Sequence, residues 1–329
     1  MVKIIIITII LLILELIYFQ VATRFNIIDK PNQRSSHSSI VLRGGGIIFL
    51  FGTWLYACFF GFKYPWFLLG LTAISLISFV DDVRSVPNQV RLIVHFASML
   101  LMLYQLGLLQ WSAWWIVLIA LIVSVGATNV INFMDGINGI TVGYSLAVII
   151  PLVLMNLRMP FIDPNFLYVV IASLLVFAIF NFRDKGKAKC FAGDVGAIGI
   201  AFIMLFAIGR LVILTEDVTW LLFLVVYGID GGLTICHRII LHENLGEAHR
   251  KHVYQLMANE LKMSHPLVSG IYMLIQLVIS LGLIYMCPDA IVAHWIYFIC
   301  AVTLLAIAYV LFKKKYYYLH EEYLKTINM

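Results

Sequence analysis

One short polar stretch between two long apolar segments has the residue types and spacing of a chemical site. Asn129, Asn132 and Asp135 stand three residues apart, so on a helix two amides and one carboxylate lie on the same face. Gly136 and Gly139 follow, and at glycine the backbone can turn sharply or approach a ligand closely. Oxygen ligands beside glycines suggest a site for a cation and a phosphate. A capped helix end followed by a polar turn is the alternative.

Acidic side chains also appear in two other polar segments. Asp81 and Asp82 directly follow an apolar run, and adjacent carboxylates at a bilayer boundary are costly to desolvate. They suggest a metal, a phosphate–metal complex or a proton relay, unless they only mark the end of a helix. Asp194 follows Gly193, where backbone amides could face an anion or a metal, and Phe191 beside it could stack on a base.

Basic side chains in two further segments suit phosphate binding. Arg34 and Arg43 could contact phosphate oxygens, and the three glycines at 44–46 would permit a close backbone approach. The stretch 249–252, which reads His-Arg-Lys-His, offers donors for a pyrophosphate. Its histidine spacing could suggest zinc, but no cysteine or acidic partner completes a tetrahedral set. Cytoplasmic loops of membrane proteins are rich in arginine in any case, so composition alone also explains Arg34 and Arg43.

The elements that hold these segments are expected to be membrane helices. The chain has 329 residues, of which 63% are hydrophobic and 12% charged, and its mean hydropathy is +1.00. A soluble domain could not bury so much apolar surface, so lipid must be the solvent. We therefore expect an all-α integral membrane protein, a single polytopic domain over residues 1–329, with about eleven transmembrane helices. The apolar runs that predict them are 4–22, 44–62, 65–80, 92–110, 111–128, 140–157, 165–182, 195–213, 218–236, 266–286 and 290–312.

The distribution of basic residues predicts the orientation of these helices. Of the 22 lysines and arginines, 18 fall in the segments after odd-numbered spans or in the C-terminal tail. By the positive-inside rule these parts are cytoplasmic, which places the N-terminus outside and the C-terminus in the cytoplasm. The run after Lys3 is longer than the apolar core of a signal peptide, so we expect a retained first helix. The polar segments 23–43, 81–91, 129–139, 183–194 and 237–265 would then all lie on the cytoplasmic face.

Taken together, the polar segments resemble those of the polyprenyl-phosphate N-acetylhexosamine-1-phosphate transferases. The resemblance covers most of the chain and rests on four motifs in the order in which that family carries them. Three features resemble the branch of this family that starts bacterial O-antigen and related surface glycans. They are residues 31–37, the arginine and glycines at 43–46, and the His-Arg-x-His form of the stretch 249–252. The peptidoglycan enzyme of the family has a triple-histidine motif instead. The four motifs are Asp81-Asp82, Asn129-x-x-Asn132-x-x-Asp135-Gly136, Phe191-x-Gly193-Asp194-x-Gly196 and His249-Arg250-Lys251-His252.

The resemblance implies a reaction at the membrane surface. Undecaprenyl phosphate would attack a UDP-linked N-acetyl sugar of the GlcNAc or 6-deoxy-HexNAc type, form a lipid-linked pyrophosphoryl sugar and release UMP. Mg²⁺ is the implied cofactor, with Mn²⁺ as an alternative, because phosphoryl transfer depends on neutralising negative charge. The implied partners are the UDP-sugar, undecaprenyl phosphate and membrane lipid, with no nucleic acid and with a homodimer left open. The implied location is the bacterial inner membrane, with the active site facing the cytoplasm.

The resemblance also assigns roles to single residues. Asn132 and Asp194 would hold the metal. Asp81, supported by Asp82, would act as a base or position the lipid phosphate, and Asp135 would help to shape the nucleotide site. The implied substrate-binding residues are Arg43, Asn129, Phe191, which would pack on the uracil, His249, Arg250 and His252.

The chain departs from the family pattern in two places. The family usually has Asp-Gly-x-Asp-Gly, whereas here Asn138 replaces the second aspartate and removes its charge. The segment before Asp194 is rich in lysine instead of proline, which either alters the sugar pocket or has no effect on it.

Two other functional classes remain open. A transporter or flippase would couple ions through its carboxylates, but it predicts repeats of opposite topology and charges near the middle of spans. Apart from Glu15 and Arg210, we expect the charges to lie at the ends of spans. A scaffold that binds anionic lipid would explain the lysines but not the four ordered motifs.

Overall fold

The fold is taken from a computed structural model that describes residues 1–29, 40–109, 114–244 and 249–327. The proline-to-histidine stretch at 31–37, with Arg34, lies outside the described residues. All other candidate site residues lie within them.

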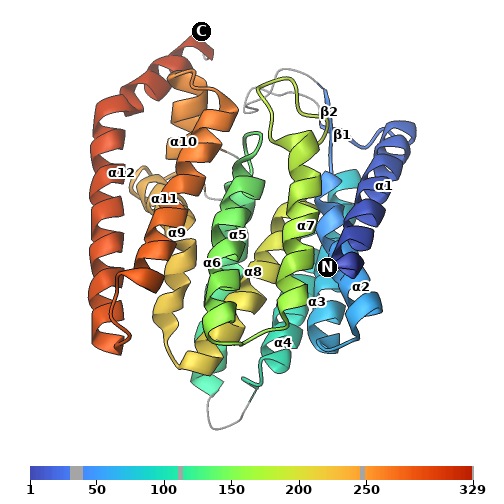
Figure 1. Ribbon diagram of the computed structural model, residues 1–329. Coiled ribbons are helices and arrows are strands. Elements are labelled where there is room, and N and C mark those ends of the chain that lie inside the picture. The colour runs from blue at the N-terminus through green and yellow to red at the C-terminus, as the bar shows by residue number, and fades with distance from the viewer. Residues whose placement is uncertain (30–39, 110–113, 245–248, 328–329) are drawn as a thin grey trace.

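The described residues are mostly helical and contain almost no sheet, which confirms the all-α fold class (Figure 1). Two short strands, β1 (Ile28–Asp29) and β2 (Val41–Leu42), pair antiparallel in the first polar segment. The helical elements are α1 (Val2–Arg24), η1 (Gly45–Ile47), α2 (Ile48–Phe60), α3 (Pro65–Val83), α4 (Asn88–Gln105), α5 (Trp114–Phe133), α6 (Ile140–Arg158), α7 (Pro164–Asn181), α8 (Gly193–Thr215), η3 (Val218–Leu224), α9 (Val225–Ile240), α10 (Val253–Gln255), η4 (Leu256–Glu260), α11 (His265–Tyr285) and α12 (Ile291–Ile327).

Nine helical segments in the described part of the chain are long and apolar enough to cross a membrane. The other two expected spans, 44–62 and 92–110, correspond to η1 with α2 and to α4. The first of these is short for a span, and the second begins with the polar residues Asn88, Gln89 and Arg91. Each of the eleven expected runs therefore forms a helix, although two of them are weaker candidates for crossing the bilayer.

Local sequence signals set where several helices begin. Pro65 and Pro164 stand in the first turns of α3 and α7, where a missing N–H costs nothing. Asp163 caps α7 by accepting a hydrogen bond from the Asn165 N–H at 2.9 Å. Gly139 precedes α6 with a φ of +86°, a left-handed conformation that glycine adopts without strain.

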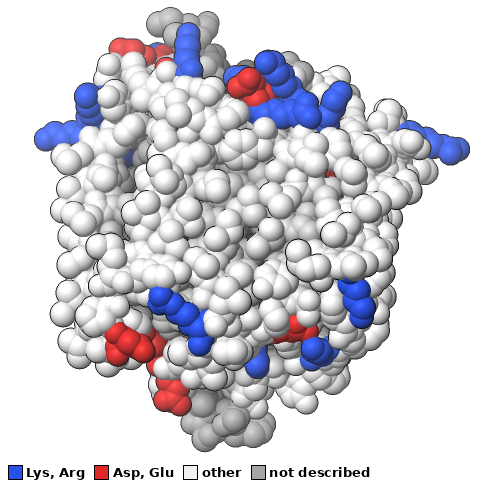
Figure 2. Space-filling model, in the orientation of Figure 1, with Lys and Arg blue, Asp and Glu red and all other residues white. Residues whose placement is uncertain are grey.

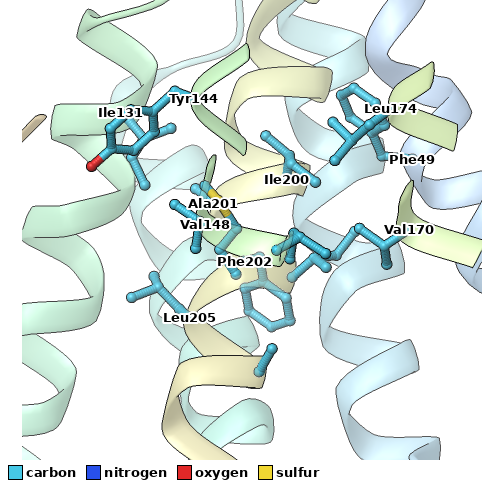
Figure 3. Close-up of a cluster of buried hydrophobic side chains, with 14 of the residues drawn as sticks. Phe49, Ile131, Tyr144, Val148, Val170, Leu174, Ile200, Ala201, Phe202 and Leu205 are labelled. Atoms are coloured by element: carbon cyan, nitrogen blue, oxygen red, sulfur yellow. The ribbon is translucent and has the colours of Figure 1, made fainter. Parts of the chain in front are cut away.

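Helices α6 and α8 form the centre of the bundle. In each, 72% of the span is buried inside the protein, whereas only 6% of the α12 span is. Figure 3 shows Phe202 and Leu205 of α8 in one buried cluster with Val148 of α6 and Val170 of α7. The peripheral helices α1, α5 and α12 present apolar side chains outward, as helices do whose solvent is lipid.

On the face of the molecule shown in Figure 2, charged side chains gather at the two ends of the bundle. A pale band lies between this upper and this lower rim of charge. The five long polar segments meet at the end where β1 and β2 lie, at the top of Figure 1. The assignment of this end to the cytoplasm stays a prediction from the positive-inside rule.

Candidate functional site

The first polar segment is held against the start of α8 by a contact between glycines. The Gly46 N–H donates to the Ala192 carbonyl at 3.1 Å. A Cβ atom at Gly46 would lie only 2.3 Å from the Cα of Gly196, so a larger residue would force η1 away from α8. The glycines thus allow the backbones of η1 and α8 to touch, and this contact holds Arg43 beside the α8 N-terminus.

Asp82 joins three elements at the same point. Its side chain is fully buried, and its two oxygens accept the backbone N–H groups of Asp194 and Val195, each at 3.0 Å. Arg43 Nε lies 2.8 Å from the same carboxylate. Asp82, at the end of α3, therefore caps the first turn of α8 and holds Arg43 in place.

Asp81 orders the link between α3 and α4. It accepts the Val86 N–H at 2.8 Å, and Arg91 Nη1 lies 2.6 Å from its other oxygen. Arg91 is a site residue that the sequence analysis missed, because only the fold brings the first turn of α4 back to the end of α3.

Asp194 stands where the other groups converge. It lies in the first turn of α8, its side chain is 21% exposed, and it is hydrogen-bonded to the Asn132 side chain at the end of α5. Arg43 and Arg91 each place a terminal nitrogen 3.7 Å from one of its oxygens. The two expected metal ligands, Asn132 and Asp194, are therefore in contact, and the helix N-terminus adds a positive field beside them.

Asp135 lies in the turn between α5 and α6. Thr141 donates a hydrogen bond to its carboxylate at 2.5 Å. The pKa of Asp135 is raised to about 6, mainly by burial. The Thr141 hydrogen bond opposes this shift, and the charge of Asp194 adds to it. This carboxyl group can therefore change its charge close to neutral pH.

The charges of this cluster favour a divalent cation. Two guanidinium groups, of Arg43 and Arg91, lie among the carboxylates of Asp81, Asp82 and Asp194, and the charges of Asp194 and Arg43 both act on Asp135. The cluster thus holds two more acidic than basic groups. Within the described ranges, no group of three or more His, Cys, Asp and Glu side chains could hold a metal by itself. Mg²⁺ is often bound by one or two protein ligands and completed by water and substrate phosphates, so the pair formed by Asn132 and Asp194 fits it.

Asn138 has a structural place that explains the loss of the aspartate. Its side-chain N–H₂ donates to the carbonyls of Arg183 and Asp184 at 3.0 and 2.9 Å, and the residue is 2% exposed. Its backbone carbonyl accepts a hydrogen bond from Ser269 at 2.9 Å. An aspartate could not donate to the two carbonyls, so asparagine ties the turn after α5 to the segment after α7.

Two other expected substrate-binding residues lie around the cluster. Phe191 is half-buried three residues before Asp194, and its backbone N–H donates to the Leu42 carbonyl at 2.8 Å. Asn129 is exposed on α5, one turn before Asn132.

The His-Arg-Lys-His stretch packs behind the turn that carries Asp135. His252 is buried, with Nδ1 3.4 Å from a carboxylate oxygen of Asp230, and the half-buried His249 ring lies 4.9 Å from it. Burial lowers the pKa of His249 to about 3, so its imidazole is neutral at neutral pH. Arg250 forms an ion pair with Glu260 at 2.9 Å and is thereby occupied within the protein.

Asp230 in α9 organises this stretch and was not recognised from the sequence. It is 3% exposed and accepts the Val253 N–H at 3.0 Å and the Tyr272 hydroxyl at 2.5 Å. Tyr254 in turn donates to the Phe133 carbonyl at 3.1 Å, which links α10 to the end of α5. The only sequence signal for Asp230 was a charge inside an apolar run, and such a charge is a sign of function by default.

Comparison with known proteins finds similarity over the middle of the chain. Residues 64–214 match the model of glycosyl transferase family 4, a region that contains Asp81, Asp82, Asn132, Asp135 and Asp194. Over this region, which is a little under half of the chain, the protein is similar to glycosyl transferase family 4. The matched region leaves out Arg43 and the stretch 249–252, which the structure brings to the same end of the bundle as the family core.

Two relatives extend the family 4 match. A protein of Methanocaldococcus jannaschii, provisionally named a glycosyltransferase, is 33% identical over 196 residues, which are 57% of this chain and 60% of the relative. A Bacillus subtilis protein named "probable undecaprenyl-phosphate N-acetylglucosaminyl 1-phosphate transferase" is 25% identical over 298 residues, 83% of this chain and 81% of that protein. The match to the archaeal relative thus spans less than two thirds of its length.

Proposed function

We propose that the chain transfers an N-acetylhexosamine-1-phosphate group from a UDP-sugar to undecaprenyl phosphate and releases UMP. The observation that carries this proposal is the contact of Asp194 with Asn132 at a helix N-terminus, flanked by two arginines. Carboxylate, amide and guanidinium groups together match a metal-bound diphosphate. The name of the Bacillus relative supports the same acceptor and a GlcNAc donor.

Mg²⁺, or Mn²⁺ in its place, would be held by Asn132 and Asp194. When bound, it would supply positive charge to the phosphate oxygens, which is most of what phosphoryl transfer requires. Asp82 is fully used by the α8 N-terminus and Arg43, so we assign it to holding these groups in position. Asp81 would hold Arg91 in position in the same way.

The chain's own residues would then position two substrates for one displacement. An oxygen of the lipid phosphate forms a bond to the β-phosphorus of the nucleotide sugar, the bond from that phosphorus to the bridging oxygen breaks, and UMP leaves with the electron pair. Arg43 and Arg91 have terminal nitrogens 3.7 Å from Asp194, longer than a hydrogen bond, and could turn to the substrate phosphates. Asp135, as base or as part of the nucleotide site, would act in its ionised form.

The remaining groups would bind the donor. Phe191 would stack on the uracil, Asn129 would contact the donor, and the side chains of His249 and His252 would face its diphosphate or sugar. Arg250 would have to leave Glu260 to reach a substrate phosphate. We place the reaction on the cytoplasmic face of the inner membrane, at the start of an O-antigen-like or capsule-like glycan, with a GlcNAc-type or 6-deoxy-HexNAc-type sugar.

The test is UMP release by the purified protein in detergent with undecaprenyl phosphate, Mg²⁺ and a panel of UDP-N-acetyl sugars. We expect UMP from one or a few of these sugars, and only when lipid and metal are both present. Asp194→Ala should lower the rate by at least about 100-fold, because charge neutralisation by a metal is worth several kcal/mol in the transition state. Asp184→Ala is the matched control, since that carboxylate is exposed and pairs only with Lys187 among the described residues. No UMP from any sugar with folded wild-type protein, or an unchanged rate in Asp194→Ala, would overturn the proposal.

A further inference from the structure

The proposed reaction leaves unused a cavity at the other end of the bundle. It has a volume of about 350 Å³, within the range of small-ligand pockets. The ends of α6 and α11 and the beginnings of η3 and α12 form its walls, at the lower end of Figure 1. The cavity is therefore separated from the Asp194 cluster by the length of the membrane-spanning helices.

One carboxylate of this cavity already has hydrogen-bond partners within the protein. Asp217 accepts the Thr219 N–H at 2.8 Å and lies 2.6 Å from His294 Nδ1. Both side chains are almost completely buried, at 6% and 8% exposed. The pair ties the start of η3 to the first turn of α12 and keeps the two walls of the cavity together.

Two charged groups of opposite sign remain for a ligand. Arg158 lies over the Tyr285 ring at 4.2 Å and donates from Nη1 to the Ile284 carbonyl at 2.7 Å, which fixes its guanidinium at the cavity. Within the part of the chain that the structure describes, its Nε and Nη2 atoms have no hydrogen-bond acceptor. Asp289, on the α11–α12 link, is exposed and has no basic partner among the same residues.

The position of the cavity indicates the source of the ligand. Its lining residues lie at the lower end of the bundle, where Figure 2 shows charged side chains bordering an apolar band, which is the level of lipid head groups. Met155 and Ile291 add apolar surface to the lining. A guanidinium binds phosphate well, and a free carboxylate binds an ammonium group but repels a second anion.

We propose that this cavity binds the zwitterionic head group of a phospholipid, with its phosphate on Arg158 and its ammonium group on Asp289. The site is independent of the proposed sugar transfer. A head group that carries phosphate alone would leave Asp289 without a partner and meet its negative charge.

The test measures retained lipid by native mass spectrometry. The delipidated protein is titrated with vesicles of equal parts phosphatidylethanolamine and phosphatidylglycerol. We expect the wild type to retain phosphatidylethanolamine in preference, and Arg158→Ala and Asp289→Asn each to weaken its apparent affinity about tenfold, as expected for one charged hydrogen bond. Lys63→Ala is the control at the same end of the bundle, because the nearest cavity to Lys63 measures only about 10 Å³.

Three results would overturn the proposal. They are equal retention of both lipids by the wild type, unchanged retention in both variants, and binding of soluble phosphoethanolamine as tightly as the lipid. The last result would assign the cavity to a soluble molecule. If Arg158→Ala fails to fold, Asp289→Asn decides the question, since it removes no contact within the described residues. UMP release should be unchanged in Asp289→Asn, which separates this test from that of the proposed function.

Discussion

At the scale of single residues, Asn138 shows how one atom decides what a position can do. Its amide nitrogen faces two carbonyl oxygens in a buried turn. Asn138→Asp restores the family pattern but places a carboxylate against those carbonyls. We expect a loss of about 2 kcal/mol of stability or more, the cost of leaving buried polar groups unpaired, together with lower activity.

Thermal unfolding and UMP release of Asn138→Asp are the measurements. Asn129→Asp makes the same chemical change at an exposed position and should leave the unfolding temperature unchanged. An Asn138→Asp protein as stable and active as the wild type would show that the two amide hydrogen bonds contribute nothing.

The pKa of Asp135 predicts how the rate depends on pH. Burial raises this pKa from 3.8 to about 6, so in the folded protein the carboxyl gains its proton between about pH 7 and 5. Because the ionised form is the one assigned to the reaction, kcat/KM should fall on the acid side of pH 6. The protonated form is favoured by folding, so the contribution of Asp135 to stability is full below about pH 4 and is lost as the pH rises through 6.

A pH profile of UMP release tests this assignment. Thr141→Val removes a hydrogen bond that lowers the pKa of Asp135, so it should move the acid limb to higher pH. A limb that stays in place in Thr141→Val would belong to another group.

The sequence predicted the members of the candidate site better than the residues that hold them in position. Asn132 and Asp194 were expected to act together, and they are in contact. Arg91 and Asp230 were missed, because a guanidinium or a carboxylate gains its meaning only from partners on other helices. Asn138 was noticed as a departure, but its donors could not be understood before the segment after α7 was placed beside it.

At the scale of elements, the contact between η1 and α8 sets the position of the site. Gly46→Ala would place a Cβ atom 2.3 Å from the Gly196 Cα and displace η1, at a cost of roughly 1–3 kcal/mol for overpacking. Gly126→Ala in α5 is the matched control, since a Cβ atom there meets nothing within 4 Å and alanine favours helix.

Thermal unfolding and the KM for the UDP-sugar should separate the two glycine variants. Gly46→Ala should unfold at lower temperature and bind the donor more weakly, while Gly126→Ala should equal or exceed the wild type in stability. Equal behaviour of both variants would show that the glycine contact is not tight.

At the scale of the whole molecule, helix positions followed from apolar runs, but their depth in the bundle did not. The runs for α8 and α12 are similarly apolar, yet one is central and the other is largely exposed to lipid. Hydropathy reports the solvent of a helix, and lipid and protein interior are equally apolar. The separation of charge into two rims was predictable for the same reason.

The orientation in the membrane is the prediction that belongs to this scale. Asp289→Cys and Asp184→Cys, in a background without the five native cysteines, place exposed thiols at opposite ends of the bundle. A membrane-impermeant maleimide should label Asp289→Cys in intact cells and Asp184→Cys only after permeabilisation. The reverse pattern would place the candidate site outside the cell.

The capping of α8 by Asp82 has a consequence for reading mutational data. Replacing Asp82 frees the first turn of the helix that carries Asp194, so activity would vanish without any loss of a reacting group. A survey of aspartates scored by turnover alone would give Asp82 and Asp194 the same rank. Unfolding measurements would tell them apart, because only the Asp82 variant loses the clamp between α3 and α8.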